Sequence, residues 1–517
     1  MTRSGVIVLL LVLLALAWFG TLGIRPLYKA DESRYGEIPR EMVASGDWVT
    51  PRLNGFRYFE KPPLQYWTTA AFFTFLGEKD WVARLSTALA GFAGILLVFY
   101  AGNRLWGPPA GAYAAAVLAG SPLYVVLGQV NTLDMMVSVF LAAALIAFLR
   151  GRMLWFWAAC ALAVLSKGLI GIVLPGAAIL VYLLLKKDWK LIPRMRPVAG
   201  PLLFLAITAP WFVAVSRANP EFAHFFFIQE HFQRFTTEMH HRVHPFWYFV
   251  PILAGGLAPW LLPWLRALRP RDDATLFLVV WTAVVFFFFS ASDSKLPPYV
   301  LPIAPAAALL LGRSLAKEWP RRLVLLQVVL LLVVSVCAAI ALPFVAKGYA
   351  EYARWLSAAF ALMALAAAIA GIFAWRDARA AAIVSLAAGG LVATQVGLAG
   401  HLTISGRFSV ASTVAQLHER PPPDVPVFAV AGYDHTFPWT LKRTVTMVGY
   451  RDELAQAISW EPVKYIPDLG AFAQAWKAAP QAWAFIRMGD LEKLPRELGL
   501  RFQVMAQGPV YAIVKKP

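Results

Sequence analysis

Residues 322–345 read RLVLLQVVLLLVVSVCAAIALPFV, and only Arg322 in this run carries a charge. An apolar run of this length is long enough to cross the hydrocarbon core of a bilayer as one helix. Similar runs recur along the chain, which has 517 residues, 59% of them hydrophobic and 15% charged. Soluble globular chains are about half apolar and about a quarter charged, so a soluble enzyme is excluded. The sequence predicts a polytopic α-helical membrane protein.

The apolar runs predict thirteen membrane-spanning helices. They lie at residues 6–24, 82–103, 110–128, 133–149, 153–165, 168–185, 198–215, 246–265, 274–290, 299–312, 322–345, 353–374 and 380–403. The first run is too long for the apolar part of a signal peptide and lacks a small-residue cleavage site. We therefore expect it to remain in the protein as a spanning helix.

The net charge of +18 supports this topology when it is divided among the loops. With the N-terminus inside, the inner loops carry 18 basic residues, and the outer loops apart from 25–81 carry seven. Because basic residues accumulate in cytoplasmic loops, the excess predicts a cytoplasmic N-terminus. Loops 25–81 and 217–245 and the C-terminal tail then lie outside. Most of the positive charge reflects topology, so we expect no nucleic-acid partner.

The composition changes near Gly406, where the last apolar run has ended. Strand-like runs at 426–431, 444–448, 482–487 and 503–515 alternate with helical stretches near 451–459, 470–478 and 490–497. This alternation is typical of an α/β domain. We expect residues 1–405 to form the transmembrane domain, with loops 25–81 and 217–245, and residues 406–517 to form a small outer α/β domain.

The first outer loop places polar residues where a spanning helix begins. Asp31, Arg34 and Tyr35 have the i, i+3 and i+4 spacing of one helix face, and we expect a short helix over residues 30–42 that breaks near Pro39. Asn54-Gly55 is a turn signal. Residues 64–76 form an aromatic-rich amphipathic stretch that suits a helix along the membrane interface. The predicted outer ends of later spans add further polar and aromatic side chains: Asn131, Asp134, Lys167, Glu230, His231, Arg234, Lys295 and Tyr299.

This mixture of charges suits transfer from a lipid that bears a phosphate. Lys and Arg at headgroup depth can donate charge-assisted hydrogen bonds to a phosphate and stabilise negative charge on a leaving group. Carboxylates there can act as general bases or hold a hydroxyl or amine. An isolated carboxylate near hydrocarbon is costly, so Asp31, Glu60 and Asp134 need partners or a function.

Two groups of motifs carry a family resemblance. Asp31-Glu32-Ser33-Arg34-Tyr35, followed by Tyr58-Phe59-Glu60-Lys61-Pro62-Pro63, resembles the first periplasmic loop of bacterial GT-C glycosyltransferases of the family-39-like group. Residues 230–235, 241–242 and 245–249 are similar to the lipid A 4-amino-4-deoxy-L-arabinose transferase branch, and residues 295–302 complete the set. Pro63 and Leu64 are closer to the wider family, and Pro298 stands where that branch has threonine.

The resemblance implies an inner-membrane enzyme that moves a sugar from polyprenyl phosphate to a lipid A phosphate on the periplasmic face. By motif, Asp31 and Glu60 would be catalytic, and Lys61, Arg234 and Tyr299 would bind the donor phosphate. The substrate cavity would be lined by Arg34, Tyr35, Tyr58, Asp134, Lys167 and Lys295. The resemblance also allows a divalent cation held by Glu60 and His231. We expect a monomer whose partners are donor, acceptor and membrane lipids.

Two alternatives stay open. A protein or polysaccharide glycosyltransferase of the O-mannosyltransferase type would act on hydroxyls and would need Asp31 as general base, whereas a phosphate acceptor is already ionised. A transporter for a lipid-linked sugar predicts charged residues near the bilayer midplane. The charges of this chain collect at the predicted outer boundary, which favours a transferase.

Overall fold

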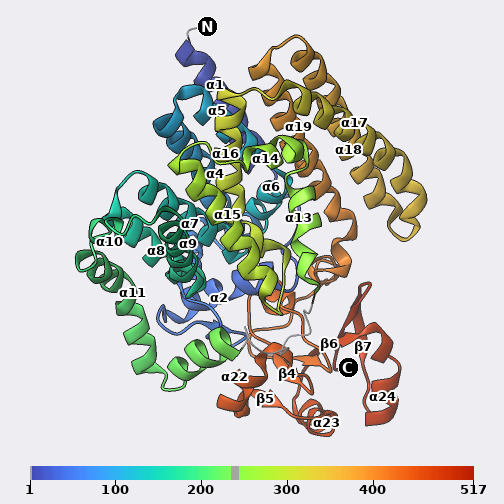
Figure 1. Cartoon of the computed structure of the whole chain (residues 1–517). Coiled ribbons are helices and arrows are strands. Elements are labelled where there is room, and N and C mark those ends of the chain that lie inside the picture. Colours follow the sequence, from blue (N-terminus) through green and yellow to red (C-terminus); the bar gives the residue numbers. More distant parts are fainter. Residues whose placement is uncertain (1–2, 234–243) are drawn as a thin grey trace. The chain divides into compact units, whose positions relative to one another are not determined.

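The computed structural model describes residues 3–233 and 244–517 (Figure 1). Contacts divide the chain into two compact units. The first contains Met1–Leu22, Glu60–Gln65 and Arg84–Gly400, and the second contains Gly23–Phe59, Tyr66–Ala83 and His401–Pro517. Most of the first outer loop therefore belongs to the same unit as the tail, whereas the sequence grouped it with residues 1–405.

Every predicted apolar run is largely helical, although the first helix ends at Phe19 rather than at residue 24. The helices of this part of the chain are α1 (Arg3–Phe19), α4 (Asp80–Trp106), α5 (Pro108–Ala119), α6 (Pro122–Gly128), α7 (Leu133–Leu149), α8 (Met153–Lys167), α9 (Ile170–Lys186), α10 (Leu191–Arg194), α11 (Ala199–Ala218), η1 (His224–Gln233), η2 (Phe246–Tyr248), α13 (Phe249–Gly256), η3 (Ala258–Trp260), α14 (Leu261–Ala267), α15 (Asp273–Ala291), η4 (Pro297–Val300), α16 (Ile303–Lys317), α17 (Arg321–Val345), η5 (Lys347–Tyr349), α18 (Ala350–Trp375) and α19 (Arg379–Gly400). The predicted α-helical fold class is confirmed.

Among the described residues, fewer helices are long enough to cross a membrane than the thirteen apolar runs predict. Six helices in the described part are long and apolar enough to cross a membrane, or up to eight if each of two bent pairs is one span. The pair α5 and α6 bends by 66° before Pro122, and α13 and α14 are bent by 79° around η3. Proline lacks the backbone N–H that would continue a helix. Helices α7, α8 and α9 are shorter, so thirteen crossings stay a prediction.

Small residues allow the helices of the first unit to pack closely. A Cβ added to Gly312 on α16 would lie 2.4 Å from the carbonyl oxygen of Ala110 on α5. Without a hydrophobic driving force between helices in lipid, such close approach is a main source of packing energy. Helices α17, α18 and α19 pack in sequence along one another (Figure 1). The first unit is therefore a bundle in which each helix rests against a neighbour.

The second unit is built around a six-stranded sheet. Its elements, with those of the first outer loop, are α2 (Asp31–Ser45), β1 (Arg52–Leu53), β2 (Phe56–Arg57), α3 (Leu64–Leu76), η6 (His401–Arg407), α20 (Ala411–Val414), β3 (Val427–Val430), α21 (Thr436–Leu441), β4 (Thr446–Val448), η7 (Asp452–Leu454), α22 (Ala455–Trp460), η8 (Pro462–Lys464), β5 (Tyr465–Ile466), α23 (Leu469–Ala478), β6 (Trp483–Arg487), η9 (Met488–Asp490), α24 (Lys493–Leu498), β7 (Gln503–Gln507) and β8 (Tyr511–Lys515).

The strand order of this sheet is β5-β4-β3-β6-β8-β7. Strand β3 is parallel to β4 and β6, whereas β8 is antiparallel to β6 and β7. The predicted α/β domain is thus confirmed. The run at 503–515 is a hairpin of two strands, since the chain turns at Gly508 and Pro509 between them. The sequence did not indicate the short strand β5 or helix α21.

Two local predictions for the first outer loop have different outcomes. The helix expected over residues 30–42 is α2, but the break expected at Pro39 is wrong because α2 continues to Ser45. Nearly the whole of α2 is buried, and this packing offsets the one backbone hydrogen bond that proline removes. The turn expected at Asn54-Gly55 joins β1 to β2, and both residues have positive φ, 53° and 81°, as a two-residue hairpin turn requires.

Candidate functional site

Helix α2 brings three predicted site residues together within the second unit. Arg34 donates from Nη1 to Oδ1 of Asp31 at 3.0 Å, and its guanidinium carbon lies 5.7 Å from the ring centroid of Tyr35. The Arg34 side chain is 8% exposed and that of Asp31 is 51% exposed. The i, i+3 and i+4 spacing thus produces an accessible carboxylate bonded to a buried cation.

The tail supplies a second carboxylate to Arg34, which the sequence did not indicate. Glu453 in η7 accepts hydrogen bonds from Nε of Arg34 at 3.2 Å and from Nη2. His435 also bonds Glu453. Burial by itself would raise the pKa of Glu453, but the charges of His435 and Arg34 lower it to about 2. Glu453 is therefore ionised at neutral pH.

The same environment keeps Arg34 charged. Burial alone would lower its pKa, but Tyr58 and the carboxylates of Glu453 and Asp31 raise it well above the ordinary value. Tyr58 is itself buried, and its backbone N–H donates to the Pro51 carbonyl at 2.9 Å. Of the predicted cavity residues, Arg34, Tyr35 and Tyr58 therefore lie in one electrostatic environment with Asp31.

A second cluster of charges lies further along α2. Arg40 donates to both oxygens of Glu37, at 2.5 and 2.7 Å. The backbone N–H of Gly55 donates to Oε2 of Glu41 at 2.9 Å. Burial and the neighbouring Glu37 raise the pKa of Glu41 to about 8. Helix α2 thus carries both a strongly ionised network around Arg34 and a carboxyl group that titrates near neutral pH.

The other predicted catalytic carboxylate, Glu60, lies in the first unit beside the predicted phosphate-binding lysine. Nζ of Lys61 lies 3.9 Å from Oε2 of Glu60 and donates to the Glu60 backbone carbonyl at 2.8 Å, and both side chains are 14% exposed. Four residues later, Gln65 donates to Oδ1 of Asn131 at 3.2 Å. This bond ties the segment Glu60–Gln65 to the start of α7, where Asp134 lies.

Three further predicted residues meet at the ends of α7, α8 and η4. Lys167, the last residue of α8, forms an ion pair with Asp134 in the first turn of α7. The Lys167 ammonium also lies 4.9 Å from the ring centroid of Tyr299, in η4. Lys295 instead bonds the backbone carbonyl of Ser292 at 2.5 Å, within its own turn. The pairing satisfies the charges of Lys167 and Asp134, and their roles toward a substrate stay predictions.

The loop that carries the remaining predictions is described only in part. Arg234 lies outside the described residues, and of His231 only the backbone, in η1, is described. Among the described residues, no group of three or more His, Cys, Asp or Glu side chains could hold a metal ion. The cation site expected at Glu60 and His231 therefore stays a prediction.

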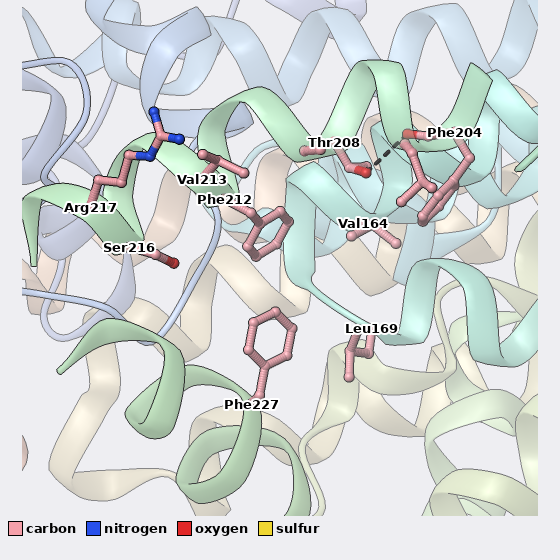
Figure 2. Close-up of a pocket in the computed structure, with 11 residues that line it drawn as sticks. Val164, Leu169, Phe204, Thr208, Phe212, Val213, Ser216, Arg217 and Phe227 are labelled. Carbon is pink, nitrogen blue, oxygen red and sulfur yellow. Dashed lines mark hydrogen bonds between the residues drawn. The ribbon is translucent and has the colours of Figure 1, made fainter. Parts of the chain in front are cut away.

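An apolar pocket of about 550 Å³ lies between α8, α9, α11 and η1 (Figure 2). Phe212 and Phe227 are in ring contact on one side of it, with centroids 5.7 Å apart, and Val164 and Leu169 form another side. The only hydrogen bond drawn there runs from the Thr208 hydroxyl to the backbone carbonyl of Phe204, at 2.9 Å. Its other lining residues are Leu205, Ala209, Val213, Ser216 and Arg217. Such walls suit a hydrocarbon chain better than a sugar.

Two family profiles match this chain. The family described as "Aminoarabinose transferase C-terminal domain" matches residues 413–516. The family described as "Dolichyl-phosphate-mannose-protein mannosyltransferase" matches residues 60–213. The first covers the sheet and its helices, and the second runs from Glu60 and Lys61 into α11.

Curated relatives share about a third of the residues. The undecaprenyl phosphate-alpha-4-amino-4-deoxy-L-arabinose arabinosyl transferase of Aeromonas hydrophila is 36% identical over 322 residues, 58% of this chain and 58% of that protein. The same-named protein of Erwinia tasmaniensis is 35% identical over 315 residues, 57% of either chain. This chain thus spans less than two thirds of the length of these relatives.

Solved structures match over nearly the full length. ArnT from Cupriavidus metallidurans bound to undecaprenyl phosphate gives a TM-score of 0.94 at 35% identity, over 99% of this chain and 98% of that chain. Its apo state gives 0.92 with the same coverage. The oligosaccharyltransferase of Archaeoglobus fulgidus is 14% identical with a TM-score of 0.52, over 94% of this chain and 70% of that one, and shares the fold alone.

Proposed function

This chain belongs to the ArnT family of aminoarabinose transferases, and from this premise we propose that it transfers 4-amino-4-deoxy-L-arabinose from undecaprenyl phosphate to a phosphate of lipid A. The observation that carries the proposal is the full-length match to an ArnT bound to undecaprenyl phosphate. The sugar is the one in the names of the curated relatives. The acceptor follows from the family alone.

The donor side of the proposal is supported by a cation and by an apolar pocket. Lys61 is partly buried beside Glu60, so its ammonium can donate to a phosphate from a site with limited access to water. The pocket between α8, α9, α11 and η1 supplies the apolar surface that an isoprenoid chain needs. Arg234 and Tyr299 complete the proposed phosphate site by motif.

In the proposed reaction, a lipid A phosphate oxygen attacks the anomeric carbon of the sugar. A new carbon–oxygen bond forms, the bond between that carbon and the undecaprenyl phosphate oxygen breaks, and its electron pair remains on the departing phosphate. Lys61 and Arg234 stabilise this charge. The attacking phosphate is already ionised, so Asp31 is not needed as a strong base and instead stabilises positive charge that develops at the anomeric carbon. A hydroxyl acceptor would give Asp31 the role of general base.

We further propose that the protein lies in the inner membrane with the second unit on the periplasmic side. The excess of basic residues in the predicted inner loops supports this orientation. The enzyme would then take lipid A from the outer leaflet. Asp134 and Lys167 are predicted to lie at that side of the membrane, at the outer ends of α7 and α8.

The decisive experiment is mass spectrometry of lipid A from a host with and without this chain. We expect an added mass equal to one aminoarabinose residue, attached to a phosphate. A host whose lipid A is unchanged, while a protein or polysaccharide gains a sugar, would establish the alternative of transfer to hydroxyls and overturn the assignment of the acceptor. An added sugar of another mass would overturn the assignment of the sugar.

A further inference from the structure

The network around Arg34 contains a carboxylate that the proposed mechanism does not use. Arg34 donates to both oxygens of Glu453, from Nε to Oε1 at 3.2 Å and from Nη2 to Oε2. Two parallel bonds of this kind fix the plane of a guanidinium group, because rotation would break both. The remaining nitrogen, Nη1, is the one that donates to Asp31 at 3.0 Å.

We propose that Glu453 is a positioning residue, by which the C-terminal tail holds Arg34 in the orientation that orders the Asp31 carboxylate. The inference rests on the proposed function, because Asp31 has a chemical role only if the chain transfers a sugar. Glu453 itself acts through Arg34 and is assigned no contact with substrate.

Burial gives this arrangement its strength. The side chains of Arg34 and Glu453 are 8% and 18% exposed, so water competes little for their hydrogen bonds. His435 bonds the same Oε1 atom that accepts from Nε of Arg34. Because an ionised carboxylate only accepts, Nε2 of His435 must carry the proton in this bond. Both oxygens of Glu453 are therefore held by donors.

The charges explain why a second carboxylate matters to Asp31. Arg34 paired with Asp31 alone would form a neutral pair, and the guanidinium would be free to turn its other donors toward the Asp31 oxygens. With Glu453 present, Nε and Nη2 of Arg34 are engaged by that carboxylate, and only Nη1 serves Asp31. Asp31 keeps an electrostatic attraction for positive charge at the anomeric carbon.

A second tie in the same unit provides a matched control. Glu461 accepts from Nη1 of Arg52 at 3.1 Å and from the backbone N–H of Arg57 at 2.9 Å. Glu461 also joins the tail to the first loop. Burial alone would raise its pKa, but hydrogen bonds from Lys464, Arg57 and Arg52 lower it. Its hydrogen bonds with Arg52, Arg57 and Lys464 do not involve Asp31 or Arg34. Glu461→Gln therefore weakens a similar link between the tail and the first loop but leaves the hydrogen bonds of Arg34 in place.

The first experiment compares purified full-length Glu453→Gln, Glu453→Asp and Glu461→Gln with the wild type, with undecaprenyl phosphate-linked donor and lipid A in detergent. We expect Glu453→Gln to lower kcat about tenfold, the scale of one lost charge-assisted bond, with little change in the KM for donor. Glu453→Asp should restore part of kcat, and Glu461→Gln should keep it. Equal kcat in Glu453→Gln and wild type, or equal losses in Glu453→Gln and Glu461→Gln, would overturn the inference.

The second experiment is a double-mutant cycle with Arg34→Gln. If Glu453 acts through Arg34, the double variant should lose no more kcat than Arg34→Gln alone. Losses that multiply would show that Glu453 acts by another route and would overturn the inference. A wild type that transfers no sugar to lipid A would instead overturn the proposed function, so the two failures are distinguishable. Thermal midpoints of all variants show whether each reduced kcat belongs to folded protein.

Discussion

Lys61 is the residue whose predicted role is easiest to separate from a structural one. Its Nζ already donates to the Glu60 carbonyl at 2.8 Å, so the ammonium is held in place before a phosphate binds. Lys61→Ala should raise the KM for the undecaprenyl phosphate-linked donor by about tenfold or more, since hydrogen bonds to charged groups contribute roughly 1.5–3 kcal/mol. Initial rates at varied donor concentration measure this. Lys347→Ala, at an exposed position, should leave the KM unchanged, and an unchanged KM in Lys61→Ala would contradict the phosphate role.

Asp31 is predicted to act on the reacting carbon, so its loss should affect kcat. Asp31→Asn keeps the size of the side chain but removes the charge, and we expect kcat to fall by about a hundredfold, the scale of one lost electrostatic contact in a transition state. Asp47→Asn is the control, because Oδ1 of Asp47 accepts the backbone N–H groups of Val49 and Thr50 at 2.9 and 3.0 Å, and an amide oxygen can accept both. Full activity in Asp31→Asn would exclude both proposed roles of this carboxylate.

Glu41 predicts a pH dependence of stability. Burial and Glu37 raise its pKa to about 8 in the folded protein from its ordinary value of 4.5, so the folded state holds the proton more tightly than the unfolded state. Its contribution to stability is present below about pH 4.5 and is lost as pH rises through about 8. Glu41→Gln stays neutral and should therefore gain thermal stability over the wild type as pH rises from 5 to 8. A constant difference in thermal midpoint across that range would contradict this assignment.

At the scale of elements, hydrophobic runs and turn residues carried the local predictions. The apolar runs predicted helices, and Asn54-Gly55 predicted a turn, because both signals depend on neighbouring residues. The helix break predicted at Pro39 is wrong because the burial that stabilises α2 is a tertiary effect, which the local sequence does not report. The bond between Asn54 and the backbone of Val445 joins residues 391 positions apart, and no local pattern reports such pairs.

In the candidate site too, local sequence patterns predicted neighbours on one helix but not partners distant in sequence. Asp31, Arg34 and Tyr35 could be grouped from their helical spacing, and the structure brings them together on α2. Glu453 could not be added, because its segment showed only a helical tendency and its partner lies far away in sequence. The alternation of spans placed both Asp134 and Lys167 at predicted outer ends, and the structure pairs them.

The pocket beside α11 predicts how the length of the isoprenoid chain affects donor binding. If it holds part of the isoprenoid chain, Val213→Trp should fill it and raise the KM for a long-chain donor, while the KM for a donor with a short isoprenoid should change little. Leu202→Trp, on the same helix but outside the pocket lining, is the control. Equal effects of Val213→Trp on both donors would show that the chain lies elsewhere.

At the scale of the whole molecule, topology decides where every proposed step takes place. The excess of basic residues predicts that the loop at 186–198 is cytoplasmic and the tail periplasmic. Val463 in the tail is 95% exposed and Trp189 in that loop is 52% exposed, so either position accepts a cysteine reporter. The native Cys160 and Cys337 are free and would first be replaced by alanine.

In such a background, a membrane-impermeant maleimide should label Val463→Cys in intact spheroplasts and label Trp189→Cys only after permeabilisation. The reason is that the two reporters lie on opposite sides of the bilayer in the predicted topology. Reversed labelling would place the second unit in the cytoplasm, away from lipid A in the outer leaflet, and would exclude the proposed acceptor. Labelling of both reporters in intact spheroplasts would mean that the number of crossings between them is even, and would contradict the seven spans predicted between residues 198 and 403.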